Sequence, residues 1–275
     1  MLNRVNAPAF QPINTLAIHQ PEALTFDNGM KAFVFQSADL ELIKFEFVFA
    51  NIFDAHELPL LNTALASMLK EGTKNRTSAQ IADEVDFYGA YLVPEYSFDH
   101  TSLTLYTMHK YVDKVLHIVL DILQNAIVPQ KELDTYIRNN KQSLEISLKK
   151  NDFVARRLFY QNVFGNNRYG VVPTPESFDK MKRDDLINLY LKQIVPQNCT
   201  LFIAGNVSAD VIAVVSDLFG AQWVGADLPL AVDSVPMDLD KSLLVTAEIP
   251  DSLQSAIRLG GVSINRRHAD YPALQ

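Results

Sequence analysis

Residues 63–101 read TALASMLKEGTKNRTSAQIADEVDFYGAYLVPEYSFDHT, and this stretch decides the fold. Apolar side chains recur at helical spacing until Gly72, which predicts a first helix that ends there. Thr77 or Ser78 can cap a second helix, which Gly89 ends. Two β-prone runs follow, at about 90–96 and 101–108, and we expect them to pair as neighbouring strands.

The flanking sequence continues this mixed order. We expect strands on both sides of Asp27-Asn28-Gly29 and at about 40–50 and 199–204, and helices at about 111–150 with a break near Pro129, 152–163, 183–193 and 208–219. Long helices between strands and hairpins indicate an α+β sandwich of sheet and helices rather than a simple βαβ array.

The composition changes towards the C-terminus, where Gly225, Pro229 and Pro236 interrupt any periodicity. We therefore predict a first domain at 1–220, a linker at 221–241, and the opening strands of a second domain at 242–275. Since that second domain would contain only SLLVTAEI, LQSAIRLGGVSI and the start of a helix, we expect it to be truncated.

Composition excludes several classes of protein. The 275 residues are 48% hydrophobic and 20% charged, with a net charge of -8, which argues against a nucleic-acid-binding surface. The N-terminus has no signal-peptide core and no later run is long enough to span a bilayer, so the sequence predicts a cytoplasmic protein without a membrane partner. The single cysteine, Cys199, lies in an apolar strand and is interpreted as a buried side chain.

The opening stretch resembles the signature region of the pitrilysin, insulinase and mitochondrial-processing-peptidase type zinc peptidases, the inverzincins. Their frame is matched without a gap by Met68-Leu69, Gly72-Thr73, Ile81, Gly89, Leu92, Asp99 and Thr101. Softer matches occur at 168–178, 200–207 and 255–274. The resemblance implies the LuxS/MPP-like metallohydrolase fold, in which helices cover a largely antiparallel sheet.

The metal-binding motif of that family, H-x-x-E-H, is absent. The resemblance places its first His at Thr63, its Glu at Ala66 and its second His at Ser67. Zinc requires two imidazoles one helical turn apart, and the Glu must accept a proton from the bound water. Hydroxyls at Thr63 and Ser67 are poor zinc ligands, and Ala66 offers no base. The resemblance therefore implies no catalytic residue and no cofactor.

The third zinc ligand of the family is a Glu on a later helix, and Glu145 falls close to its position. Two interpretations stay open. Glu145 is a vestigial ligand, or it belongs to a surface charge ladder with Lys141 and Lys149 at i-4 and i+4.

Active relatives also bind an extended peptide along an edge strand through an Asn-Ala pair, which corresponds to Val93-Pro94 here. Pro94 lacks a backbone donor and would impair strand addition. Protection of the edge against aggregation is an equally good explanation.

Other candidate metal sites are weak. His56-Glu57 lacks the second His of a zincin motif, and His100, His109 and His117 do not have ligand spacing.

The leading hypothesis is a non-catalytic subunit that pairs with an active H-x-x-E-H homologue and helps to enclose a peptide. The alternatives are a zinc-dependent metalloendopeptidase with a non-standard site and a free-standing peptide-binding or scaffold protein.

Overall fold

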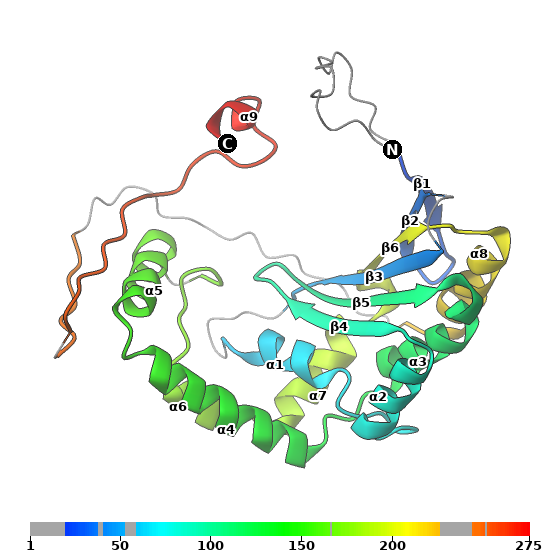
Figure 1. Cartoon of the computed structure of the whole chain (residues 1–275), viewed down its shortest axis with the longest axis horizontal. Helices are drawn as coiled ribbons and strands as arrows, with labels where there is room; N and C mark the ends of the chain where they lie inside the picture. Colours follow the sequence, from blue (N-terminus) through cyan, green and yellow to red (C-terminus); the bar gives the residue numbers. More distant parts are fainter. Residues whose placement is uncertain (1–19, 38–40, 53–58, 166, 226–243, 251) are drawn as a thin grey trace, which may run out of the picture.

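The computed structural model of the chain describes residues 20–37, 41–52, 59–165, 167–225, 244–250 and 252–275. Its body is a six-stranded sheet with helices packed on it (Figure 1). The strands are β1 (Glu22–Thr25), β2 (Lys31–Gln36), β3 (Leu42–Ala50), β4 (Tyr91–Tyr96), β5 (His100–Met108) and β6 (Cys199–Gly205). The helices are α1 (Leu61–Met68), α2 (Ser78–Phe87), α3 (Val112–Asn125), α4 (Gln130–Ser147), α5 (Asn151–Phe164), α6 (Pro175–Asp179), α7 (Arg183–Gln193), α8 (Ala209–Val215) and α9 (Tyr271–Leu274). Short 3-10 turns occupy η1 (His109–Tyr111) and η2 (Pro196–Asn198), and a π-helical turn, η3 (Ser216–Gln222), continues α8.

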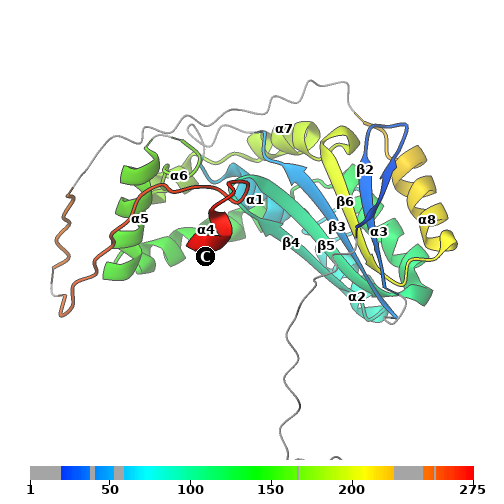
Figure 2. The same ribbon diagram turned by 90° about the horizontal axis from the view of Figure 1, so that it is seen from above.

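The sheet has the strand order β1-β2-β6-β3-β5-β4, so β6 lies between two strands from the start of the chain. Four ladders are antiparallel, and only β2 and β6 run parallel. Helix α1 packs on β4 and β5, and α3 packs on β5. Figure 2 shows α7, α3 and α8 along the same side of the sheet. The prediction of an α+β fold with a largely antiparallel sheet is confirmed.

The predicted hairpin joins β1 to β2 through a turn at Phe26–Gly29. Gly29 has a φ of 87°, a conformation that favours glycine. Asn28 Nδ2 donates to the carbonyl oxygens of Phe219 (2.6 Å) and Trp223 (3.0 Å). The turn is thereby fastened to η3, about two hundred residues later in the chain.

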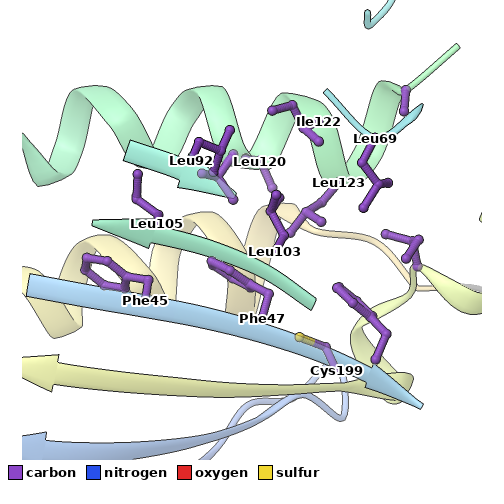
Figure 3. Close-up of a cluster of buried hydrophobic side chains, with 14 of the residues drawn as sticks. Phe45, Phe47, Leu69, Leu92, Leu103, Leu105, Leu120, Ile122, Leu123 and Cys199 are labelled. Carbon is purple, nitrogen blue, oxygen red and sulfur yellow. The ribbon is translucent and has the colours of Figure 1, made fainter. Parts of the chain in front are cut away.

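The core lies between the sheet and the helices (Figure 3). Phe45 and Phe47 of β3 and Leu103 and Leu105 of β5 are all fully buried, and they face side chains of α3 such as Leu123. Alternating residues of β3 point to this side, as the burial pattern of the strand shows. Each such side chain contributes about 1.5–3 kcal/mol by leaving water.

Cys199 lies at the start of β6 in the same cluster (Figure 3). Its thiol is buried, and burial raises the pKa of that thiol well above its usual value. The prediction of a buried, unreactive cysteine is confirmed.

Trp223 shows that the folded unit extends beyond the predicted boundary at residue 220. Its side chain is 2% exposed and packs edge-on against Phe49 and Phe219, with ring centroids 6.1 and 6.2 Å away. The predicted linker therefore begins too early, because Ala221 and Gln222 belong to η3. Residues 226–241 of that linker lie outside the described residues, and the division into two domains stays a prediction.

The loop after α1 is held to α3 by the carboxylate of Asp121, which is 6% exposed. It accepts hydrogen bonds from Thr73 Oγ1 (2.7 Å), Asn75 Nδ2 (2.5 Å), Arg76 Nη1 (2.8 Å) and Asn125 Nδ2 (2.9 Å). Burial acts to raise the pKa of Asp121, but these hydrogen bonds outweigh it and leave the pKa below its usual value. The same loop leads to α2, which Thr77 caps through a capping box with Gln80, as predicted.

The two C-terminal segments predicted as strands form no ladder in the described part of the chain. Residues 244–249 and 252–265 have no strand assignment, and Leu253, Ile257 and Leu259 are largely exposed. Their β-branched and alternating residues favour strands, but a strand needs a neighbouring strand to bond with. The prediction of paired strands is wrong for the chain as described, and only α9 follows.

None of the helices in the described ranges is long and apolar enough to cross a bilayer.

Candidate functional site

Helix α1 carries the three positions where the resemblance places the metal motif. It packs against β4, β5, α4 and α7. Ala66 is 3% exposed, whereas Thr63 and Ser67 are half-buried one turn apart on the same face. Ser67 Oγ donates to the carbonyl oxygen of Thr63 at 3.1 Å, so one of the two hydroxyls is already engaged within the helix.

Two tyrosines meet these hydroxyls. Tyr96 of β4 lies beside the Thr63 side chain, and Tyr136 of α4 lies beside the Ser67 side chain, so that each hydroxyl acts to lower the pKa of its neighbouring phenol. Burial raises the pKa of Tyr96, and it raises the pKa of Tyr136 to about 12, so both phenols are neutral at physiological pH. Sequence reasoning missed both residues.

These side chains do not fit a zinc ion. Zinc takes imidazole, thiolate or carboxylate ligands, and Thr63 and Ser67 offer neutral hydroxyls that lie beside phenols. Ala66 has no group that could accept a proton from a metal-bound water. Within the described ranges, no group of three or more His, Cys, Asp or Glu side chains is close enough to hold a metal ion.

Glu145 is not brought to this site. It lies nine residues after Tyr136 on α4, about two and a half turns, so the two side chains point to opposite sides of the helix. Its side chain is exposed. Of the alternative charge ladder, Lys141 pairs with Asp179 of α6 at 2.7 Å, and the Glu145 carboxylate also acts to raise the pKa of Lys141.

The histidines are also separate from one another. His100 contacts Ser97, His109 contacts Ser208, and His117 lies 3.7 Å from Asp113. His56-Glu57 lies outside the described residues.

Val93 and Pro94 lie on β4, at the open edge of the sheet. The Ser97 N–H donates to the His100 carbonyl at 2.8 Å, and hydrogen-bonded pairs alternate along an antiparallel ladder. Pro94, opposite Leu103, is therefore in a non-hydrogen-bonded pair, and its nitrogen faces the open edge. Pro94 thus removes a donor from the side where a further strand would bind, and Leu92 and Tyr96 keep theirs.

Asn51 fixes the turn between β4 and β5. Its Nδ2 donates to the carbonyl oxygens of Ser97 (2.9 Å) and Phe98 (3.2 Å), and its buried Oδ1 accepts from Thr101 Oγ1 (2.8 Å) and Gln193 Nε2 (3.1 Å). This network, which sequence reasoning did not identify, joins the end of the edge strand to α7.

The segment that follows α5 is held beside the same turn. Arg168 Nη1 donates to the Asn51 carbonyl at 3.4 Å, and the Tyr169 phenol donates to Asp99 at 2.5 Å. Burial and the neighbouring Asp99 carboxylate raise the pKa of Tyr169 to about 12. The site therefore combines α1, the edge strand β4, the face of α4 with Tyr136, and the Arg168-Tyr169 segment.

Comparison with known proteins agrees with the resemblance of the signature region to insulinase-type peptidases. The profile of the family described as Insulinase (Peptidase family M16) matches residues 64–171. An "Uncharacterized zinc protease" of Rickettsia bellii is 27% identical over 150 residues, which are 54% of this chain and 36% of that protein. The mitochondrial-processing peptidase subunit alpha-1 of Dictyostelium discoideum is 23% identical over 180 residues, 63% of this chain and 26% of that protein. This chain thus spans about a third of the length of the curated relatives that it matches.

Solved structures show the same fold. A peptidase M16 inactive domain from Pseudomonas fluorescens has a TM-score of 0.70 at 15% identity, over 80% of this chain and 54% of that one. A protease from Helicobacter pylori has a TM-score of 0.71 at 13% identity, over 79% and 54% of the two chains. The signature region thus matches the insulinase-type peptidase family M16, and the sheet and helices have the fold of the solved M16 peptidase structures.

Proposed function

We propose that this chain is a non-catalytic member of the family, which binds an extended peptide along the open edge of β4 and pairs with a homologue that retains H-x-x-E-H. One observation carries the proposal: Thr63 and Ser67, at the positions of the zinc-binding imidazoles, offer neutral hydroxyls that lie beside the phenols of Tyr96 and Tyr136. The edge of β4 stays open apart from the donor that Pro94 removes, whereas the groups that would perform hydrolysis are replaced.

The chemistry of the replaced groups supports this proposal. Peptide hydrolysis by this type of site needs a Lewis acid and a base that takes a proton from water. Hydroxyl and phenol groups whose protons are held at pH 7 provide neither function. The chain is therefore proposed to need no cofactor of its own.

The relatives favour a role within a pair. One structural neighbour is described as an inactive domain, and one sequence relative is described as a subunit of a peptidase. A half that lost its own catalytic groups is useful when a partner supplies them, and a shared chamber would then be lined by both halves.

The decisive experiment mixes this chain with an H-x-x-E-H homologue from the same organism and follows hydrolysis of a quenched fluorescent peptide and the sedimentation of the mixture. We expect a heterodimer and a change in the rate of hydrolysis. The metal content of the chain, purified without chelator, is measured in parallel. Absence of association together with stoichiometric zinc in this chain would refute the proposal and favour a peptidase with a non-standard site, and a stable monomer that binds peptides would favour a free-standing scaffold.

The open edge gives a second prediction. Pro94→Ala restores an N–H that faces the edge, and we expect this change to tighten binding of an extended peptide about two- to tenfold, since one net hydrogen bond is worth about 0.5–1.5 kcal/mol. Fluorescence polarisation with a labelled peptide measures the change. Pro175→Ala, at the first turn of α6, is the matched control and should leave the affinity unaltered. Equal affinities for the Pro94→Ala variant and the original chain would show that peptides do not bind at this edge.

A further inference from the structure

A series of aromatic rings leads from the edge strand to α5. Tyr96 contacts Phe98 (6.3 Å between ring centroids), Phe98 contacts Tyr169 (5.5 Å), Tyr169 contacts Phe164 (5.5 Å) and Phe164 stacks on Tyr160 (5.9 Å). We call these five side chains the aromatic stripe. Phe98 is 42% exposed and Tyr160 is 39% exposed, and the other three rings are half-buried, so the aromatic stripe is partly open to solvent.

One face of helix α5 extends the aromatic stripe. None of its residues is buried, although it carries several large apolar side chains, and Figure 1 shows it standing apart from the sheet. Phe153, Arg157, Tyr160 and Phe164 recur at i, i+4, i+7 and i+11 and therefore lie on one face. The Arg157 guanidinium lies 5.7 Å from the centroid of the Phe153 ring. This face continues directly into the aromatic stripe.

The other side of α5 is covered by the chain itself. Asn151 hydrogen-bonds to Ser252 and to the Gln254 carbonyl, and Asp152 forms an ion pair with Arg258. Helical geometry places Asn151 on the side of α5 opposite Tyr160, and it places Asp152 on the flank between the two sides. The C-terminal segment thus leaves the aromatic face uncovered.

Two guanidinium groups accompany the aromatic stripe without a carboxylate partner among the described residues. Arg157 is half-buried, and burial lowers its pKa. Arg168 lies near Tyr96 and Tyr169, where its positive charge acts to lower the pKa of each phenol. Of the nearby carboxylates, Asp99 accepts from Tyr169 and Asp152 pairs with Arg258. Both arginines are therefore available to an incoming anion.

We propose that this surface selects peptides in which a carboxylate lies next to an aromatic side chain, the aromatic group packing on the aromatic stripe and the carboxylate binding Arg157. The inference rests on the proposed function and names the class of its peptide. Ring packing favours an aromatic group on exposed aromatic side chains, and a guanidinium binds a carboxylate through two parallel hydrogen bonds. The aromatic stripe begins at Tyr96, which also belongs to the open edge of β4, so one extended peptide can reach both surfaces.

The test compares labelled, C-terminally amidated peptides that are identical except for a central Asp-Phe, Lys-Phe or Asp-Ala pair. We expect the Asp-Phe peptide to bind about tenfold more tightly than either of the others. Arg157→Gln should bring the affinity for Asp-Phe down to that for Lys-Phe, whereas Arg138→Gln, an exposed arginine of α4, should leave the difference intact. Tyr160→Ala should remove the difference between Phe and Ala. A Lys-Phe peptide with a free C-terminal carboxylate shows whether a terminal carboxylate serves in place of the side chain.

The outcomes separate this inference from the proposed function. Peptides that bind at the β4 edge with equal affinity for Asp-Phe and Lys-Phe, or a preference that survives Arg157→Gln, would overturn the inference and leave the proposed function standing. A chain that binds none of the peptides contradicts both. A stable homodimer that Tyr160→Ala dissociates in sedimentation would also overturn the inference, because the aromatic stripe would then be a contact between two copies.

Discussion

Replacement of Asp121 by alanine is expected to lower the free energy of unfolding by about 3 kcal/mol, since it leaves the buried Thr73 hydroxyl and the half-buried Arg76 guanidinium without their acceptor. Chemical denaturation followed by circular dichroism measures this loss. Asp113→Ala, on the same helix, is the matched control. Asp113 is exposed and pairs only with Lys114 and His117, so its loss should change stability by less than about 0.5 kcal/mol.

The Asp121 carboxylate also makes the free energy of unfolding depend on pH, in a direction that its pKa shift determines. The pKa of Asp121 is lower in the folded state than in the unfolded chain, so its contribution to stability is complete above the unfolded pKa and is lost as the pH falls through the folded pKa. We expect the stability difference between the original chain and Asp121→Ala to be largest near neutral pH and to shrink in acid. A difference that does not change with pH would show that the carboxylate is not the stabilising group.

Ala66→Glu, which restores the catalytic glutamate of the family motif, is expected to destabilise the chain by about 2–4 kcal/mol. Ala66 is 3% exposed, so the longer side chain would bury a carboxylate and crowd its neighbours. Thermal and chemical unfolding measure the effect. Ala82→Glu on the exposed side of α2 is the matched control and should be tolerated within about 0.5 kcal/mol.

The Ala66→Glu prediction tests whether the site on α1 is closed to solvent or is an open cleft. In an open cleft, a glutamate at this position would be solvated and would cost little. A variant as stable as the original chain would therefore contradict the packing of α1 and weaken the proposal that the site has been rebuilt for another purpose.

Local features of the sequence predicted most of the fold. Asn28-Gly29 specified the first hairpin, Gly72 and Thr77 bounded the first two helices, and the break at Pro129 separated α3 from α4. Each of these signals acts within a few residues, through backbone geometry, a capping hydrogen bond or a missing donor. The position of β6 between β2 and β3 could not be predicted in this way, because strand neighbours are chosen by contacts between distant parts of the chain.

The candidate site was predicted less completely, for the same physical reason. The resemblance gave the positions of Thr63, Ala66 and Ser67. The tyrosines that lie beside Thr63 and Ser67 come from β4 and α4, which are distant in the sequence. The orientation of Tyr136 rather than Glu145 towards α1 depends on how α4 is rotated against it. Tyr96 could have been suspected, since it lies two residues after Pro94 and hence on the same face of β4.

The central position of β6 also determines the order in which the strands can pair while the chain is being synthesised. Strand β2 has no neighbour towards the middle of the sheet until residues 199–205 have left the ribosome, because β6 alone joins it to β3. Contacts over such a long stretch of sequence slow folding, since the chain entropy of closing the loop must be overcome before the contacts form. The N-terminal hairpin is therefore expected to wait, with the inner edge of β2 unpaired, until the last strand of the sheet arrives.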